Sequence, residues 1–460
     1  MVEFTPSYTP RIPPPLMHEE RDGLYLLLHS QRPIWTAVNG LGLEIATQCD
    51  GSHTVQDIVT RIADRYRQDS NAVYADVVTY LTQLRRVGFL RDEDEPGPTG
   101  ERLPRSTRLH ISVTENCNLR CVHCLVTGGS QKADALSTAE IYRLIDELAP
   151  ETGDSVTISG GEPLLRKDCL DILRHASNRI RTRLITNATL VDESTAAALA
   201  ELDITIQISL DGSNPAVHDR IRERGAFGRT MRAAEMLRGH GFAGELTFNV
   251  TVMRPNVADV LNVIDLGEQM GVNVYLAPLL KMGRAGSCWS ELCLAPDEYA
   301  RLYTYVYREL PHAGRRVQVG AGLQGFKPDI ADQGAWCTIG RGAAVDSSGD
   351  VYPCPLLTSS GFHLGNVKQT SLRQIIASPR LQELERFCAG RKMLIAKCRG
   401  CHWRNFCQAS CPASVLLEKG TMLETDDLCE FRQQLYRDTF FDLAQRKLQR
   451  ENLAAEQACT

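Results

Sequence analysis

The placement of cysteine constrains this chain more than any other feature of its sequence. The 460 residues include 16 cysteines, and most of these belong to two ordered arrangements. The first is a C-x3-C-x2-C triad in the stretch TENCNLRCVHCLV, residues 114–126. The second contains seven cysteines, namely Cys337, Cys354, Cys398, Cys401, Cys407, Cys411 and Cys429. Spacing of this kind indicates metal binding or thiol chemistry.

The expected location of the protein indicates that its cysteines bind metal and do not form disulfides. The N-terminal stretch has no apolar signal-peptide segment, and no run of about 18 apolar residues could span a membrane. We therefore expect a cytoplasmic protein, in which disulfides would not persist. The net charge of −5 gives no basic footprint for nucleic acid. The remaining cysteines are expected to be small buried apolar residues: Cys49, Cys169, Cys288, Cys293, Cys388 and Cys459.

Periodicity divides the chain into three domains and two connecting or terminal segments. Residues 22–92 show two strand-like runs followed by three helical patterns, which predicts a winged-helix domain within 1–95. Thr54 and Asp57 are placed as a helix capping pair. In 107–312, six β-rich runs alternate with helical stretches, which predicts an α/β fold with a partial (β/α)6 barrel. The other segments are a polar linker at 96–106, an irregular cysteine-rich domain at 313–436, and a helix or tail at 437–460.

The cysteine triad directly follows the first predicted barrel strand, RLHISVT. In barrel enzymes the C-terminal ends of the strands carry the chemistry. Three thiolates can bind three irons of a [4Fe–4S] cluster and leave the fourth iron open. A structural zinc site would need a fourth protein ligand. His123 is poorly placed for that role because it lies directly beside Cys124, so we favour the open cluster over zinc.

The second predicted strand ends in SGGEP, residues 159–163. Gly160 and Gly161 would let the backbone approach a ligand closely. Glu162 can accept a hydrogen bond from an ammonium group. One β-α unit after the triad, this segment is a strong indication of a ligand site.

The segments CNLRCVHC, SGGEPLLR, ITNAT and ISLDGSNPAVHDRIRERGAF together resemble the radical S-adenosylmethionine (SAM) superfamily, from residue 107 to about 290. The resemblance implies that the open iron chelates SAM and that the chain contacts it through Gly160, Gly161, Glu162, Pro163, Asn187, Ser209, Asp211 and Arg222. It also implies reductive cleavage of SAM to a 5′-deoxyadenosyl radical, which removes hydrogen from an unactivated carbon. A reducing partner such as flavodoxin or ferredoxin is implied with it.

The seven later cysteines resemble the SPASM domain, which carries two auxiliary [4Fe–4S] clusters in peptide-modifying enzymes. The resemblance assigns Cys337, Cys354 and Cys411 to the first auxiliary cluster. It assigns the other four to the second cluster: Cys398, Cys401, Cys407 and Cys429. Two zinc ribbons are disfavoured because seven thiols do not divide into two four-cysteine sites.

The first auxiliary cluster lacks an obvious fourth ligand. Fully ligated relatives have a further cysteine just before the first motif cysteine, but ADQGAW precedes Cys337 here. Either the cluster keeps an open iron, which could bind a substrate thiol, or Cys288, Cys293 or Asp332 completes it.

The N-terminal pattern resembles the PqqD-like recognition element, a winged-helix domain that binds leader segments of ribosomally made precursor peptides. Trp35, Asn39, the Asp50–Gly51 turn, TVQDIV and VGFL carry this resemblance over residues 22–92. It implies that a leader peptide adds as a strand. The expected binding edge is the strand at 33–38 with the helix near 75–86.

Together these resemblances imply a radical SAM enzyme that forms a cross-link in a precursor peptide, with a thioether as first choice and a carbon–carbon bond second. The alternatives are an anaerobic sulfatase-type maturase that oxidises Cys or Ser, and a non-catalytic peptide-binding cluster protein. Sulfatase maturases have an aspartate directly after the second SPASM cysteine. Here Pro355 occupies that position, and proline cannot act as a base.

Overall fold

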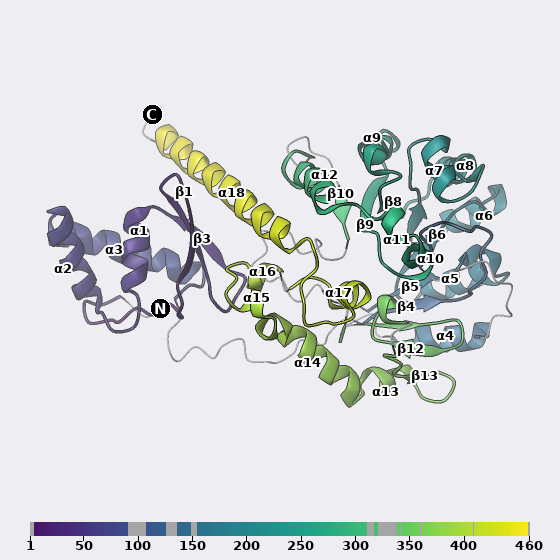
Figure 1. Ribbon diagram of the computed structural model, residues 1–460, viewed down its shortest axis with the longest axis horizontal. Helices are drawn as coiled ribbons and strands as arrows, with labels where there is room; N and C mark the ends of the chain where they lie inside the picture. Colours follow the sequence, from purple (N-terminus) through teal and green to yellow (C-terminus); the bar gives the residue numbers. More distant parts are fainter. Residues whose placement is uncertain are drawn as a thin grey trace.

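The computed structural model describes residues 4–90, 107–125, 136–148, 154–310, 317–320, 337, 339–340, 342–358, 361–407 and 409–458, the last nine without side chains. The predicted linker at 96–106, Asp332 and Cys459 lie outside the described residues. Figure 1 shows the N-terminal domain at one end of the molecule, the barrel at the other, and the cysteine-rich domain between them.

The N-terminal domain pairs a small antiparallel sheet with three helices (Figure 1). The sheet has the order β1-β2-β3 and contains β1 (Met17–Arg21), β2 (Leu24–Leu28) and β3 (Trp35–Val38). The helices are α1 (Gly40–Gln48), α2 (Val55–Tyr66) and α3 (Ser70–Arg86). The sequence predicted only two of these strands. The predicted cap of α2 is confirmed, because Asp57 N donates to Thr54 Oγ1 at 3.1 Å and Thr54 N donates to Asp57 Oδ2 at 2.9 Å.

All six predicted barrel strands are present and parallel, and they pair in chain order. They are β4 (Arg108–Ser112), β5 (Ser155–Ser159), β6 (Arg181–Thr186), β7 (Ile204–Ser209), β8 (Glu245–Val252) and β9 (Asn273–Pro278). The helices that accompany them are α4 (Thr138–Asp146), α5 (Cys169–Ser177), α6 (Glu193–Ala200), α7 (Pro215–Ile221), α8 (Ala226–Gly239), α9 (Val260–Met270), α10 (Gly283–Ser287), α11 (Trp289–Leu292) and α12 (Pro296–Arg308).

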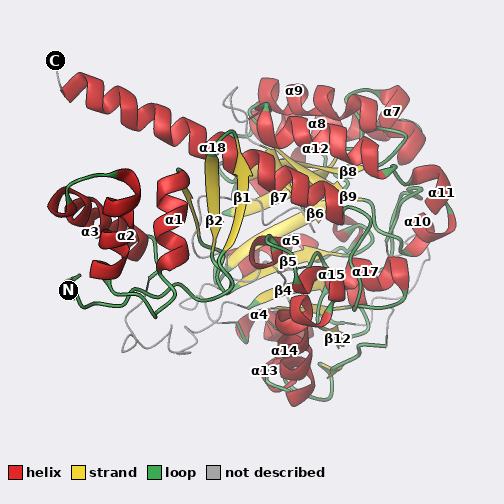
Figure 2. Cartoon of the chain, turned by 60° about the vertical axis from the view of Figure 1, so that its left-hand side comes forward, coloured by secondary structure: helices red, strands yellow, loops and turns green. Residues whose placement is uncertain are grey.

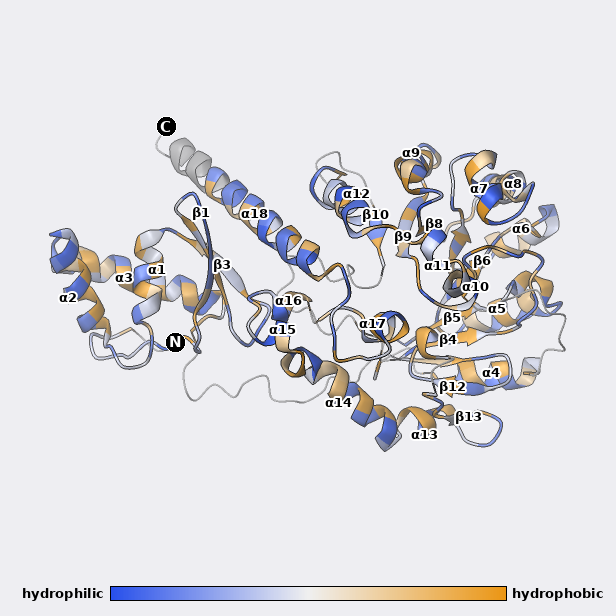
Figure 3. Ribbon diagram, viewed as in Figure 1, coloured by the Kyte–Doolittle hydropathy of each residue, from blue (hydrophilic) through white to orange (hydrophobic). Residues whose placement is uncertain are grey.

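The barrel core is formed by the apolar strands and the inner faces of the helices. Ile206, Ile208 and Val250 are fully buried in it. Apolar residues recur at every second position of these strands, as Leu246, Phe248, Val250 and Val252 do in β8, so one face of each strand carries the apolar side chains. Figure 3 shows hydrophobic, orange residues on these strands and also on the helices, and Figure 2 shows helices packed around the strands. The predicted α/β partial barrel is confirmed.

The sheet continues beyond the barrel at both edges. The full order is β10-β9-β8-β7-β6-β5-β4-β11-β12-β13. At one edge β10 (Val317–Val319) pairs with β9, and at the other β11 (Gly342–Val345) pairs in parallel with β4. β12 (Asp350–Tyr352) and β13 (Gly365–Asn366) then follow as antiparallel strands. The cysteine-rich domain is therefore joined to the barrel through one sheet.

Short helices complete the cysteine-rich domain. They are α13 (Leu372–Ile376), α14 (Pro379–Leu394), α15 (Ala396–Arg399), α16 (Arg404–Cys407) and α17 (Pro412–Lys419). The last helix, α18, spans Cys429–Ala458 and so begins before the predicted boundary at 437. No helix in the described ranges is both long enough and apolar enough to cross a membrane.

The N-terminal domain docks against α18 and the Cys401–Cys407 segment. An aromatic cluster fills this interface, with the Phe440 ring 4.7 Å from the Trp35 ring and 5.3 Å from the Trp403 ring, centre to centre. Polar contacts surround it: Asn405 Nδ2 donates to His29 O at 3.0 Å, and Arg404 Nη2 donates to Ser30 O at 2.9 Å. The N-terminal domain thus contacts a segment that carries two predicted cluster ligands.

Candidate active site

The cysteine triad lies on the loop that follows β4, at the C-terminal end of the barrel strands. Cys117, Cys121 and Cys124 pack with Leu119 and Ala226 and line one cavity of about 290 Å³. Burial raises the pKa of Cys117 to about 11, so the free thiol is neutral. Iron binding would therefore displace the thiol proton.

The two glycines of SGGEP lie against the cysteine loop. Gly161 N donates to Thr114 O at 2.8 Å, and Glu162 N donates to Asn116 O at 2.8 Å. A Cβ on Gly161 would lie 2.2 Å from Asn116 O, and one on Gly160 would lie 2.3 Å from Thr114 O. Both glycines also line the cavity. They allow two loops to meet, a role that was not predicted from the sequence.

Glu162 is fully buried beneath the cavity and does not line it. Its carboxylate accepts from Thr186 Oγ1 at 2.6 Å and from Asn187 N at 2.7 Å. Burial raises its pKa against the effect of these hydrogen bonds. Pro163 begins a single 3₁₀ turn, Pro163–Leu165, outside the cavity lining. In this conformation Glu162 therefore holds the end of β6, and its oxygens already have donors.

The other predicted SAM contacts divide into lining and supporting residues. Asn187, Ser209 and Arg222 line the cavity. Asp211 is fully buried behind Arg222 and accepts from Arg222 Nε at 2.6 Å and from Thr251 N at 2.8 Å. Burial opposes ionisation of Asp211, but Arg222 and the neighbouring histidines hold its pKa below the usual value. The carboxylate fixes the guanidinium, which reaches Cys121 Sγ at 3.8 Å.

The cavity includes residues that sequence reasoning did not select. Asn249 and Thr251 lie two positions apart on the inner face of β8, and His123 lies within the cysteine loop. Asn249 Oδ1 and His123 Nδ1 are buried without a hydrogen-bond partner among the described residues. The alternation along β8 could have indicated the first two, because residues two apart face the same side of a strand.

The cysteine-rich domain forms one wall of the same cavity. Ala344, Val345, Asp346, Pro355 and Thr358 line it. They reach it because β11 pairs with β4, with Ala344 opposite His110. Pro355, the residue that replaces the maturase aspartate, is therefore inside the cavity wall.

The structure groups the seven later cysteines in two sets. Cys354 is buried in an apolar cluster against which Cys337 and Cys411 pack. Cys398, Cys401, Cys407 and Cys429 form the other set: burial raises the pKa of Cys398 to about 11, and the other three thiols add to the shift. The assignment of these thiols to two separate clusters stays a prediction of the SPASM resemblance.

The donor sets fit iron–sulfur clusters by chemistry and placement. In the described part of the chain, no three His, Cys, Asp or Glu side chains already form a closed metal site. The fit depends on three thiols at one cavity, buried polar atoms that face it without partners, and two further thiol groups. Thiolates are the protein ligands of such clusters.

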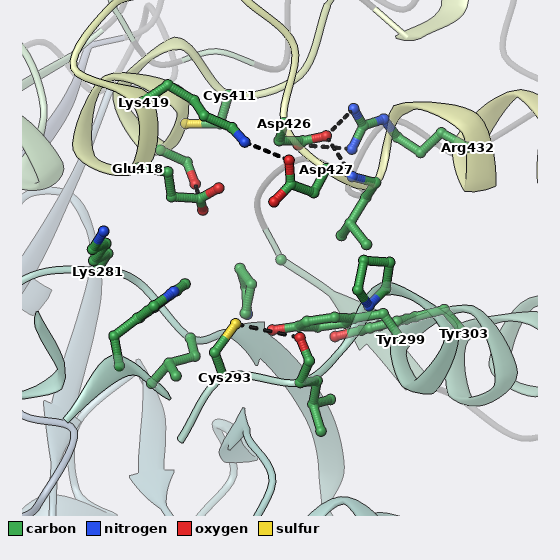
Figure 4. A pocket seen from close by; sticks show the side chains of 18 residues that line it. Lys281, Cys293, Tyr299, Tyr303, Cys411, Glu418, Lys419, Asp426, Asp427 and Arg432 are labelled. Atoms are coloured by element: carbon green, nitrogen blue, oxygen red, sulfur yellow. Dashed lines mark hydrogen bonds and ion pairs between the residues drawn. The ribbon is translucent and has the colours of Figure 1, made fainter. Parts of the chain in front are cut away.

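A second cavity, of about 300 Å³, lies between the barrel and the cysteine-rich domain. Figure 4 shows Cys411, Glu418 and Lys419 on one side and Cys293 and Tyr299 on the other. Burial raises the pKa of Glu418. Cys293 Sγ donates to Leu294 O at 3.3 Å, so this thiol already has a local partner.

The fold and the two kinds of thiol site define a radical SAM enzyme with an auxiliary iron–sulfur domain. Three family descriptions match the chain: "Radical SAM superfamily" over 111–267, "Coenzyme PQQ synthesis protein D (PqqD)" over 25–90, and the SPASM "Iron-sulfur cluster-binding domain" over 337–402.

Named relatives support the same assignment. The mycofactocin maturase MftC of Mycobacterium ulcerans is 33% identical over 263 residues, 55% of this chain and 70% of that protein. The MftC of Mycolicibacterium smegmatis is 32% identical over 294 residues, 62% and 72% of the two chains. The match covers 66% of the length of the Mycobacterium tuberculosis MftC. The chain belongs to the family of radical SAM enzymes with a SPASM domain that includes these maturases.

Solved structures show the same fold. Streptococcus suis SuiB bound to S-adenosylmethionine aligns with a TM-score of 0.59 at 16% identity, over 91% of this chain and 99% of SuiB. The enzyme anSMEcpe with bound AdoMet and Cp18Cys peptide aligns with a TM-score of 0.59 at 20% identity, over 74% of this chain and 99% of anSMEcpe. The chain therefore combines a radical SAM domain with an auxiliary iron–sulfur cluster-binding domain.

Proposed function

We propose that this enzyme modifies a ribosomally synthesised precursor peptide and forms a cross-link within it. The observation that carries the proposal is a PqqD-type domain packed directly on the cluster-bearing domain. Relatives at about one third identity are named maturases. SuiB, which shares the fold, has been crystallised bound to its precursor peptide SuiA. A leader held on the N-terminal domain would raise the local concentration of the core peptide at the barrel.

The residues of the first cavity would hold and orient the reactants. Bound SAM and its cluster would supply the radical that removes hydrogen from a carbon of the core peptide. Arg222, fixed by Asp211, presents a positive charge beside Cys121, while Asn187 and Ser209 offer polar groups at neighbouring strand ends. The wall from the cysteine-rich domain would limit the access of water.

We propose that the cross-link is a thioether, with a carbon–carbon bond as the second choice. Either link removes two hydrogens from the peptide, so its mass falls by about two daltons per link. Flavodoxin or ferredoxin is the proposed source of the electron. A sulfatase-type oxidation is disfavoured because Pro355 lines the cavity where that chemistry needs a base.

The leader is proposed to bind along β3. Within the described chain β3 pairs only with β2, so its other edge is open to strand addition. His29 N donates to Ile34 O at 2.9 Å. In an antiparallel ladder, hydrogen-bonded residue pairs alternate with non-hydrogen-bonded pairs. The backbone N–H and C=O groups of Thr36 therefore point to β2, and those of Ala37 point to the open edge. The opposite edge strand, β1, is contacted by Arg437 of α18, which donates to Glu20 O at 3.0 Å.

This arrangement predicts that Ala37→Pro blocks leader binding and leaves the enzyme folded. Proline removes one N–H at the open edge but no bond to β2, and edge strands tolerate it. Ala37→Ser is the matched control because it keeps the N–H. Leader affinity would be measured by fluorescence anisotropy with a fluorescently labelled precursor peptide. Peptide-independent formation of 5′-deoxyadenosine would report on the intact barrel.

We expect Ala37→Pro to weaken leader binding at least about tenfold, the effect of losing about 1.4 kcal/mol, with unchanged peptide-independent turnover. Equal binding by Ala37→Pro and Ala37→Ser would contradict the proposed edge. An unchanged peptide mass after reaction with the wild-type enzyme would contradict the cross-link itself.

A further inference from the structure

Helix α14 passes between the segments that carry two cysteines of the first auxiliary set. Near its middle, Glu385 packs on Gly340, where a Cβ would lie 2.4 Å from the Glu385 side chain. Gly340 is three residues beyond Cys337. Closer to the helix end, Arg391 Nη1 donates to Ser410 O at 3.1 Å, and Ser410 directly precedes Cys411.

A free cysteine outside the recognised motifs, Cys388, lies between these two contacts. Cys388 is three residues after Glu385 and three before Arg391. Residues three apart share one face of a helix and differ in height by about 4.5 Å. Cys388 therefore lies on the face of α14 that contacts both the Cys337 and the Cys411 segments.

The packing of Cys388 agrees with this geometry. Together with Cys337 and Cys411 it packs against the apolar cluster that contains Cys354. The sequence prediction treated Cys388 only as a buried apolar residue, whereas it is partly exposed and lies among the three predicted ligands.

Arg391 fixes the helix in this position. Its side chain is fully buried, and Nη2 donates to Glu424 O at 3.1 Å in addition to the bond with Ser410. A buried guanidinium shared by two loops holds α14 against them, because its bonds would otherwise be lost without replacement. The position of Cys388 beside the other thiols is therefore built into the packing.

The earlier candidates for a fourth ligand are less well placed. Cys288 packs in a separate apolar cluster with Ile221, Met253 and Leu279 of the barrel. Cys293 lies across the second cavity from Cys411 (Figure 4). Asp332 lies outside the described residues.

We propose that Cys388 is the fourth protein ligand of the first auxiliary [4Fe–4S] cluster, together with Cys337, Cys354 and Cys411. Its Sγ–H bond would break, the proton would leave to solvent, and the thiolate would bond to the iron that the motif cysteines leave open. No oxidation or reduction accompanies this step. A substrate thiol could then bind this cluster only by displacing Cys388.

The test uses the full-length chain with Cys117, Cys121 and Cys124 all changed to alanine, so that only the auxiliary clusters remain. Three proteins are reconstituted anaerobically: this parent, the parent with Cys388→Ala, and the parent with Cys293→Ala as matched control. Iron content and the Mössbauer spectrum with ⁵⁷Fe are recorded before and after addition of 2-mercaptoethanol as an external thiol.

The parent and the Cys293→Ala protein should hold equal iron, and the thiol should leave their spectra unchanged. Cys388→Ala should either lose up to about half of the auxiliary iron or retain it with one iron site that responds to the thiol. A Cys388→Ala protein with full iron and the same thiol response as the parent would overturn the proposal.

A second measurement does not depend on a variant. In the wild-type holoenzyme, Cys388 should react with iodoacetamide at least tenfold more slowly than after the iron has been chelated, while the rate for Cys288 should change little. Labelling of Cys388 at the same rate with and without iron would contradict iron ligation.

Discussion

The contact between the SGGEP turn and the cysteine loop gives the sharpest prediction about cluster binding. In Gly161→Ala the added Cβ would meet Asn116 O at 2.2 Å, whereas ordinary contacts begin near 3.4 Å. The loop must therefore retreat by roughly 1 Å. Gly161 is outside the positive-φ set, so alanine meets no backbone strain there and the effect is steric.

The cost follows from the contacts that are lost. Overpacking costs about 1–3 kcal/mol, and the two backbone hydrogen bonds between the turn and the loop contribute about 1 kcal/mol each. Asn116 directly precedes Cys117, so the thiol moves with it. Metal ligands tolerate shifts of only about 0.2 Å, and we expect the triad to lose its cluster.

Iron analysis after anaerobic reconstitution should show a loss of about one third of the iron if three [4Fe–4S] clusters are present. Formation of 5′-deoxyadenosine should fall by about 100-fold or more. Gly239→Ala, at the end of α8 where no atom lies within 4 Å of the added Cβ, is the control and should behave as wild type. Full iron and full turnover in Gly161→Ala would refute the role given to this contact.

Two further predictions concern stability. Phe440→Ala should lower the free energy of unfolding by about 3–5 kcal/mol, because the ring is fully buried between Trp35 and its neighbours. Denaturant unfolding would measure this loss, with Leu448→Ala on the exposed face of α18 as the control. Equal unfolding midpoints for the two variants would contradict the prediction. Burial lowers the pKa of His218 to about 4, and its Nδ1 accepts from Asp211 N at 3.1 Å. As the pH falls, the imidazole of His218 is protonated in the unfolded chain before it is protonated in the folded protein. The free energy of unfolding of the wild type should therefore fall by about 1.4 kcal/mol per pH unit below about pH 6.5, relative to His218→Gln. Parallel pH profiles of unfolding for the two proteins would exclude this effect.

Sequence reasoning recovered the elements that carry strong local patterns. The six barrel strands are segments of five to eight residues in which apolar residues alternate with polar ones, and the helices between them show clear helical periodicity. β1 was missed because MHEER has one apolar residue and four polar ones. Its pairing with β2, and the ion pair of Arg21 with Asp438 of α18, fix it as a strand. β11 and β12 are too short, at four and three residues, for any period to be read.

The site shows the same division between local and distant information. The spacing of the thiols was enough to predict them as metal ligands, and the structure places Cys117, Cys121 and Cys124 at one cavity. The burial of Glu162 and Asp211 could not be read from the sequence, because it depends on which strand ends meet. The cavity wall at Asp346 and Pro355 depends on the pairing of β11 with β4, which lie more than 200 residues apart in the chain. Cys388 fits no recognised spacing, and helix packing alone places it.

The continuous sheet limits how enzymes of this kind can exchange parts. The auxiliary domain enters the sheet at Gly342, where a Cβ would lie 2.5 Å from Arg108 O. A transplanted auxiliary domain must therefore bring glycine at this register and a strand that matches β4, and a linker of suitable length would not be enough. The N-terminal domain is attached by side-chain contacts instead of strand pairing. A chimera with a different leader specificity therefore needs only a matching surface on α18 and on the Cys401–Cys407 segment.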